Sequence, residues 1–359
     1  MTERNDNPLI LPHTLRMVAW EITRRCNLAC LHCRASAENG PYEGEFSTEQ
    51  CLRLIDDIAK FSTPVIILTG GEPYLREDIF DIARYGDEKG LRMVLATNGT
   101  VVTDDIARKT REAGIKRISI SLDGADAARH DSFRGVAGAF DGSLAGIEAF
   151  KRAGVEFQIN TTVTRMNLGQ VKDIYETARE LGAVAHHIFL LVPTGRGKEL
   201  ADQEIAPEDY EKTLNWFYEE SLSSPIQLKA TCAPHYYRIY RQRSGERTGA
   251  AQTHEGPLHS MTRGCMGGSS FCFISHTGQV QPCGFLEIDC GQLTERGIED
   301  IWNNSRVFND LRDLGKYKGK CGRCPFIRVC GGCRARAYEI TGDYLAGEPF
   351  CVYEPPENE

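Results

Sequence analysis

The stretch RRCNLACLHCRA, residues 24–35, places Cys26, Cys30 and Cys33 within eight positions of one another. Gaps of three and two residues allow one loop to present all three thiols to a common centre. Soft thiolates suit iron–sulfur clusters and also zinc. A four-iron cubane held by only three thiolates keeps one iron open to an external ligand, whereas structural zinc usually takes four protein ligands. The loop therefore predicts an iron–sulfur site with one open iron, with zinc as the alternative.

The composition excludes several classes of protein. The chain has 359 residues, a formal net charge of −8 and no run of five basic residues, so a nucleic-acid binder is not expected. The N-terminus has no signal-peptide core, and no stretch approaches the roughly 20 apolar residues of a membrane span. We expect a cytoplasmic protein. Its 14 cysteines are then better explained by metal binding or catalysis than by disulfides.

Short apolar runs alternate with helix-like segments along the N-terminal half of the chain. A typical helical segment is 47–61, for which Ser47 or Thr48 is a plausible N-cap. This alternation predicts an α/β fold with parallel strands and right-handed crossovers, either an open sheet or part of a (β/α) barrel. The expected strands are residues 18–22, 65–69, 93–97, 117–122, 156–163 and 188–192.

Polar and glycine-rich residues follow most of these strands. In either fold the carboxyl ends of parallel strands meet at one edge, where ligands bind. Taken singly, each of these loops could be an ordinary turn. Together with the cysteine loop they predict a cofactor-binding face. They comprise Gly70–Pro73, Asn98–Gly99, Asp123 and Pro193–Lys198.

The pairing of CxxxCxxC after the first expected strand with GGEP after the second resembles the radical S-adenosylmethionine (SAM) superfamily, over about residues 18–195. The resemblance implies a partial (β/α)6 TIM barrel, a SAM-binding 4Fe–4S cluster on the three cysteines, and SAM as cosubstrate. His32 occupies a position that is often aromatic in that family. The implied SAM contacts are Gly70, Gly71, Glu72 and Pro73 for the methionine amino group, Asn98, Ser121 and Asp123 for the ribose and carboxylate, and the backbone near Leu191 for adenine.

The cysteines near the C-terminus resemble those of the SPASM extension of radical SAM enzymes, a cysteine-rich SPASM/twitch domain that carries auxiliary clusters. The resemblance implies two auxiliary 4Fe–4S clusters. The first would use Cys265, Cys272, Cys283 and Cys333, and the second Cys321, Cys324, Cys330 and Cys351. The usual run is CxxCx5CxxxC, and this chain is one residue shorter before Cys333. Three cysteines are then spare: Cys51, Cys232 and Cys290.

The expected organisation is an N-terminal extension (1–17), a radical SAM core (18–200), a linking segment (201–260) and a SPASM domain (261–359). The alternative for the last region is a zinc ribbon, which needs only four thiols. Its ligands would be Cys321, Cys324, Cys330 and Cys333.

Residues 132–141, 186–198 and 268–287 resemble the haem-biosynthesis branch of SPASM enzymes, and within it the AhbD-type haem synthases. That resemblance implies oxidative decarboxylation of two propionates of iron-coproporphyrin III to the vinyl groups of haem b in the siroheme-dependent pathway. It also implies a low-potential electron donor. The alternatives are a sister tetrapyrrole enzyme resembling the didecarboxysiroheme deacetylase, a SPASM peptide maturase, and a non-enzymatic zinc-ribbon binding module. Because only 17 residues precede the first expected strand, we do not expect a maturase's leader-binding domain.

This chemistry suggests further binding residues. Propionates favour arginine, which binds carboxylates as a fork, and histidine can ligate or stack on a porphyrin iron. The arginine candidates are Arg24 or Arg25, Arg134, Arg196 and Arg263, and the histidine candidates are His186, His187, His235 and His276.

Overall fold

A computed structural model describes residues 9–246 and 263–356 of the chain. Within these residues the strands form one ten-stranded sheet in the order β10-β9-β8-β1-β2-β3-β4-β5-β6-β7. Neighbouring strands from β8 through β1 to β7 are parallel, and β9 and β10 are antiparallel additions. The strands are β1 Met17–Thr23, β2 Val65–Gly70, β3 Arg92–Thr97, β4 Ile118–Ser121, β5 Phe157–Val163, β6 Ala185–Leu190, β7 Gln227–Thr231, β8 Phe271–Ile274, β9 Gln279–Gln281 and β10 Gly291–Gln292.

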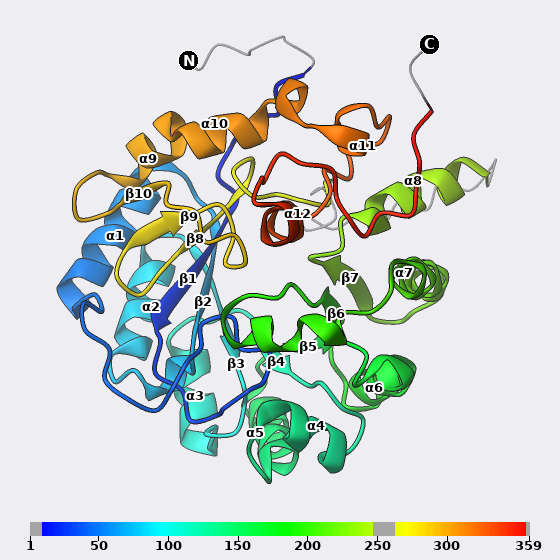
Figure 1. The fold of residues 1–359 in the computed structure, drawn as a ribbon. Coiled ribbons are helices and arrows are strands. Elements are labelled where there is room, and N and C mark those ends of the chain that lie inside the picture. The colour runs from blue at the N-terminus through cyan, green and yellow to red at the C-terminus, as the bar shows by residue number, and fades with distance from the viewer. Residues whose placement is uncertain (1–8, 247–262, 357–359) are drawn as a thin grey trace.

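The sheet curves around a central space, and α1 to α7 lie along its outer side (Figure 1). This arrangement confirms the expected α/β fold and its partial barrel. The helices are α1 Thr48–Phe61, α2 Ile79–Glu88, α3 Asp104–Glu112, α4 Ala127–Arg134, α5 Ala139–Ala153, α6 Val171–Glu180, α7 Pro207–Ser221, α8 His235–Glu246, α9 Ile298–Asn304, α10 Arg306–Arg312, α11 Gly319–Gly322 and α12 Arg334–Thr341.

Alternation along the strands separates the hydrophobic core from the central space. In β1, Val18 and Trp20 are buried in the main core cluster, whereas Ala19 between them lines the inner cavity. Helix α1 shows how local sequence sets an element's start. Ser47 accepts the backbone N–H of Gln50, and the Gln50 side chain in turn accepts the Ser47 N–H, which completes a capping box.

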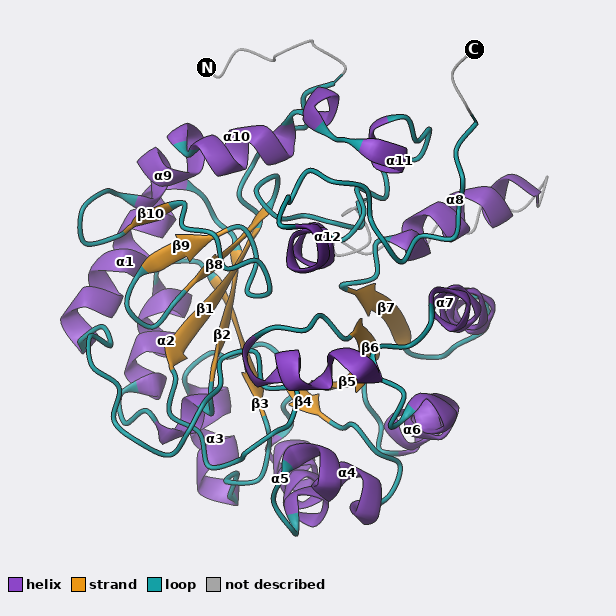
Figure 2. Ribbon diagram, in the orientation of Figure 1, coloured by secondary structure: helices purple, strands orange, loops and turns teal. Residues whose placement is uncertain are grey.

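Two features extend the arrangement expected from the sequence. The linking segment 201–260 supplies a seventh parallel strand, β7, which pairs with β6. In addition, β8 pairs with β1, so the barrel sheet continues into the C-terminal region (Figure 2). The expected boundary between residues 260 and 261 lies outside the described residues. Within the described ranges, no helix has the length and apolar character needed to cross a membrane.

Candidate active site: a cationic cavity bordered by cysteines

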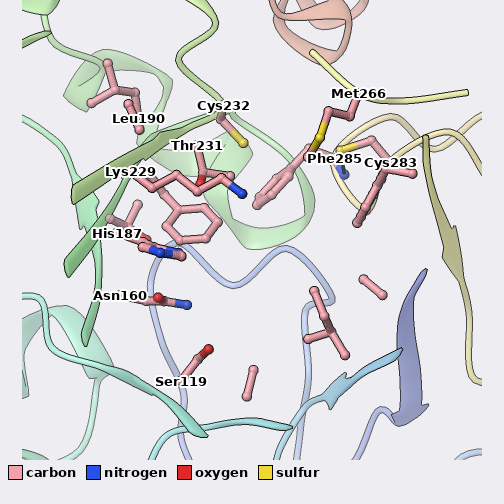
Figure 3. A pocket seen from close by; sticks show the side chains of 18 of the residues that line it. Ser119, Asn160, His187, Leu190, Lys229, Thr231, Cys232, Met266, Cys283 and Phe285 are labelled. Carbon is pink, nitrogen blue, oxygen red and sulfur yellow. Dashed lines mark hydrogen bonds between the residues drawn. The ribbon is translucent and has the colours of Figure 1, made fainter. Parts of the chain in front are cut away.

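A cavity of about 1390 Å³ occupies the inside of the barrel. Inward-facing side chains of the strands form one wall, which includes Ser119, Asn160 and His187 (Figure 3). Cys283 and Phe285 of the C-terminal region lie across from this wall. The cavity therefore connects the barrel with the cysteine-rich end of the chain.

The three cysteines of the first loop all line this cavity. Their sulfur atoms are already hydrogen-bond acceptors: the N–H of Leu28 lies 3.4 Å from Cys26 Sγ, and the N–H of Ala37 lies 3.4 Å from Cys33 Sγ. Burial raises the pKa of the Cys26 thiol to about 12, so bound iron must displace a proton there. Backbone N–H groups aimed at sulfur fit a thiolate-held cluster.

The loop after β2 fixes the cysteine loop through backbone contacts. The N–H of Gly71 donates to Thr23 O at 2.9 Å, and that of Glu72 donates to Arg25 O at 2.8 Å. A Cβ at position 71 would lie 2.3 Å from Arg25 O, so only glycine allows this approach. The glycines of GGEP are therefore explained first by backbone packing, although Gly70 and Gly71 also line the cavity.

The loop after β6 holds the same cysteine loop from a second side. A Cβ at Gly195 would lie 2.1 Å from Arg34 O. The Arg196 guanidinium donates to the carbonyls of Cys30 at 3.0 Å and Ala37 at 2.8 Å. Arg196, a candidate for a propionate, is thus committed to bracing the cysteine loop.

Two acidic residues expected at the site lie behind the cavity wall and do not line it. The Glu72 carboxylate accepts bonds from Thr97 Oγ1 and the Asn98 N–H at 2.8 Å, and its burial raises its pKa to about 7. The fully buried Asp123 carboxylate forms an ion pair with Arg134 and accepts the Thr162 N–H. Burial raises the pKa of Asp123, and the Arg134 charge opposes that rise.

The remaining expected SAM contacts lie at or next to the cavity. Asn98, Ser121 and Leu191 line it, as does His32, whose ring centroid lies 4.4 Å from that of Phe133. The Leu191 carbonyl already accepts a bond from Arg336 at 2.7 Å. Pro73 is buried and starts a short 3₁₀ turn behind the wall.

The four cysteines that the resemblance implies for the second auxiliary set lie together. Backbone N–H groups approach its sulfurs here too, from Glu348 to Cys321 at 3.3 Å and from Gly332 to Cys330 at 3.4 Å. The four cysteines line one small cavity: Cys321, Cys324, Cys330 and Cys351.

The first auxiliary set is arranged differently from the expectation. Cys272 is fully buried in β8, packed with Cys290 in the core cluster, while its neighbours Phe271 and Phe273 face the cavity. Cys232, one of the three spare cysteines, lies instead with the remaining members of the set, and all of these line the cavity: Cys232, Cys265, Cys283 and Cys333.

The backbone holds Cys232 in an unusual conformation. Its φ of 56° is a left-handed value that a non-glycine residue adopts at a cost. Its carbonyl accepts bonds from Tyr210 at 3.0 Å and Arg336 at 3.2 Å. No spacing motif contains Cys232, so the sequence offered no signal for this placement.

The zinc-ribbon arrangement is not assembled. Cys333 lies with Cys265 and Cys283, whereas Cys330 lies with Cys321 and Cys351. Throughout residues 9–246 and 263–356, no three His, Cys, Asp or Glu side chains are arranged to hold a single metal ion.

The charged side chains that line the cavity are all cationic among the described residues. Among the described residues, eight cationic side chains and no carboxylate line the cavity, although the chain carries a net charge of −8. A wall of this kind favours a polyanionic ligand. The cations are Arg34, Arg92, Arg117, Arg134, Lys229, Arg241, Arg263 and Arg334.

Most of the arginines proposed from the sequence have other partners. Arg24 pairs with Glu21 and Arg25 with Asn39. Arg263 donates to carbonyls of its own region, including Cys265 O at 2.9 Å. Arg134 lines the cavity but is paired with Asp123.

The histidine candidates are similarly dispersed. His186 is buried in the core between Tyr175 and Phe217, and His276 bonds to Glu21 at 2.7 Å. His235 lies beside the second auxiliary set. Of the four, only His187 lines the large cavity.

Comparison with known proteins agrees with this geometry. Residues 20–178 match the radical SAM superfamily, and residues 265–325 match an iron–sulfur cluster-binding domain, SPASM. A solved structure of Streptococcus suis SuiB bound to S-adenosylmethionine superposes with a TM-score of 0.73 at 17% identity, covering 96% of this chain and 78% of that one. At this identity the likeness establishes the fold alone.

Curated relatives lie much closer in sequence. An "AdoMet-dependent heme synthase" of Nitratidesulfovibrio vulgaris (strain Hildenborough) is 53% identical over 95% of this chain and 93% of its own. An "Fe-coproporphyrin III synthase" of Methanosarcina barkeri (strain Fusaro) is 31% identical over 95% and 88%. The chain is therefore a radical SAM enzyme with a SPASM domain, and it belongs to the family of the AdoMet-dependent haem synthases.

Proposed function

We propose that this enzyme oxidatively decarboxylates two propionates of iron-coproporphyrin III, which gives the vinyl groups of haem b. The observation that carries the proposal is the cavity of about 1390 Å³, lined by cations and free of carboxylates among the described residues. This volume exceeds the roughly 300–1,000 Å³ of a typical ligand pocket. It therefore suits SAM together with a large substrate that carries four carboxylates.

The residues around the first cysteine loop fit SAM and its cluster. When bound, the reduced cluster supplies the electron that cleaves SAM, and the resulting radical removes a hydrogen atom from substrate. The chain contributes the thiols of Cys26, Cys30 and Cys33 and a neighbouring cation. The Nε–H of Arg134 is buried without a partner, and its Nη1 lies 3.6 Å from Cys30 Sγ. We assign Arg134 to the methionine carboxylate of SAM, with Asp123 holding the guanidinium in place.

The reaction requires an electron acceptor. Each propionate loses a hydrogen atom from its β-carbon and its carboxyl group as carbon dioxide, and one electron is left over when the vinyl group forms. Iron–sulfur clusters accept single electrons at potentials that their surroundings tune. Cys265, Cys283 and Cys333 border the same cavity as the first loop. A cluster on these thiols is therefore well placed to receive the electron.

We further propose two auxiliary 4Fe–4S clusters. Cys321, Cys324, Cys330 and Cys351 hold one of them. Cys265, Cys283, Cys333 and Cys232 hold the other, with Cys232 in the place that the resemblance gave to Cys272. The strained backbone of Cys232 supports this assignment, because such strain persists where a site requires it.

Replacing Cys232 tests this cluster assignment. Cys232→Ala should lose up to about four irons per chain and the electron paramagnetic resonance signal of one auxiliary cluster. Cys272→Ala, which removes a fully buried thiol from the core, should keep its iron and its signals. Loss of iron from Cys272→Ala, with Cys232→Ala unchanged, would restore the assignment that the resemblance implies.

The product identifies the reaction. Anaerobic incubation with SAM, a reductant and iron-coproporphyrin III should give haem b, with a loss of about 46 mass units and one 5′-deoxyadenosine per propionate. Mass spectrometry and chromatography measure both products in one sample.

The second candidate, favoured by the 31% identical relative, is a sister tetrapyrrole enzyme. Removal of acetate groups from a siroheme derivative, with iron-coproporphyrin III left unchanged, would establish that reaction instead.

The proposal also covers the cellular compartment and the electron donor of the enzyme. None of the 14 cysteines forms a disulfide, and we propose that the enzyme works in the reducing cytoplasm. Reduction of the SAM-binding cluster there requires a low-potential electron donor, which a chemical reductant replaces in the assay.

A further inference from the structure

Three polar side chains form a row across the barrel wall. Asn160 of β5 pairs in register with His187 of β6, and His187 pairs with Lys229 of β7. All three line the cavity, because residues at one register position of neighbouring parallel strands face the same side of a sheet. Figure 3 shows them one above another on that wall. None belongs to a cysteine motif, and the SAM contacts proposed above do not use them.

Lys229 is the cation in this cavity that most needs a partner. No hydrogen bond or ion pair involves its ammonium group anywhere in the described part of the chain. By contrast, Arg34 is paired with Glu21 and Arg134 with Asp123. Arg92 and Arg241 also lack ion pairs among the described residues, but both are exposed to solvent. Lys229 is half-buried, and burial lowers its pKa. A desolvated cation without a counter-ion is costly unless a ligand supplies one.

The hydrogen-bond network determines whether the free ring nitrogen of His187 is a donor or an acceptor. The Gln158 side-chain amide Nε2 donates to Asn160 Oδ1 at 2.9 Å and lies 2.9 Å from His187 Nδ1. Because an amide nitrogen is only a donor, His187 Nδ1 accepts this bond. Burial lowers the pKa of His187, so the neutral ring carries its proton on Nε2. His187 therefore presents an N–H donor, and it has no free lone pair for iron.

We propose that Lys229 and His187 together bind one propionate carboxylate of the tetrapyrrole. Lys229 contributes the opposite charge and His187 the Nε2–H donor. The inference rests on the proposed function, because it takes the substrate class from there. It adds a specificity-determining pair on β6 and β7, and it replaces the earlier candidate role of His187 as an iron ligand.

Equilibrium binding tests the pair. Anaerobic holoenzyme is titrated with iron-coproporphyrin III and, separately, with its tetramethyl ester in mild detergent, and absorbance reports binding. Lys229→Met should weaken binding of the acid by about tenfold to a hundredfold, the range for a hydrogen bond to a charged group. Its affinity for the ester should match that of the wild type. Lys229→Arg should recover much of the lost affinity.

Two further variants make the test specific. Lys212→Met removes a lysine from α7 whose side chain is 77% exposed, and it should bind the acid as the wild type does. His187→Phe keeps a ring but removes the donor. It should weaken binding of the acid and leave the absorption spectrum of the bound iron unchanged. A shifted Soret band in this variant would make His187 an iron ligand and overturn its role as a donor.

The possible results distinguish failure of the Lys229–His187 carboxylate site from failure of the proposed function. Iron content and circular dichroism establish that each variant is folded. If folded Lys229→Met binds the acid as tightly as the wild type, the carboxylate pair is wrong while the proposed function stands. If the wild type binds neither porphyrin but still cleaves SAM, the proposed function fails and the pair fails with it.

Discussion

Cys30→Ala is expected to abolish reductive cleavage of SAM, with 5′-deoxyadenosine falling to the level of an assay without enzyme. Cys30 lines the cavity and lies next to Arg134. Losing one of three thiolates removes a ligand that the open-iron arrangement has no spare residue to replace. Chromatography of the anaerobic reaction measures the product, and iron analysis should show the auxiliary iron retained.

A matched variant controls for loss of a buried thiol. Cys51 is fully buried in α1 and does not line the cavity. Cys51→Ala should therefore cost some stability but keep SAM cleavage. Cleavage by Cys30→Ala at the wild-type rate would show that this loop does not hold the SAM-binding cluster.

The second large effect is expected from Cys351→Ala, which should uncouple SAM cleavage from haem formation. Cys351 lies at the small cavity with Cys321, Cys324 and Cys330, away from the first cysteine loop. SAM should still be cleaved, because the barrel loops that hold the first cluster are intact. The amount of haem b should fall much further, because the variant lacks one of the auxiliary clusters that would accept the electron left on the substrate.

The measurement is the ratio of haem b to 5′-deoxyadenosine in one reaction mixture. Circular dichroism must show that the variant is folded, since metal binding contributes to the folding of small metal-held regions. Cys290→Ala, which removes a thiol packed in the core, serves as the control and should keep the wild-type ratio. If both products fall in strict proportion in folded Cys351→Ala, the auxiliary clusters serve structure or substrate binding and do not accept electrons.

Local patterns in the sequence predicted the six strands from β1 to β6 and helices such as α1. They did not reveal β7, whose sequence QLKAT is short and directs Lys229 toward the cavity. A strand that presents polar residues to a binding cavity lacks the apolar run by which buried parallel strands are found. The polar side chains that made β7 hard to recognise in the sequence are also those that face the cavity and give the strand its proposed binding role.

Sequence by itself determined the elements whose contacts are local. The cysteine loop and GGEP follow consecutive strands, and parallel pairing brings their ends together without further information. The resemblance to SPASM enzymes likewise implied the second auxiliary set, which combines three closely spaced cysteines with the late Cys351. Only the tertiary structure shows that Cys272 faces the core and that Cys232 lines the cavity, because strand alternation turns Cys272 into the core while distant residues hold the backbone of Cys232. It also decided which cations are available. Arg134 and Arg196 are held by partners from distant parts of the chain, whereas the half-buried Lys229 has no ion-pair partner among the described residues. A linear pattern carries no record of such pairings.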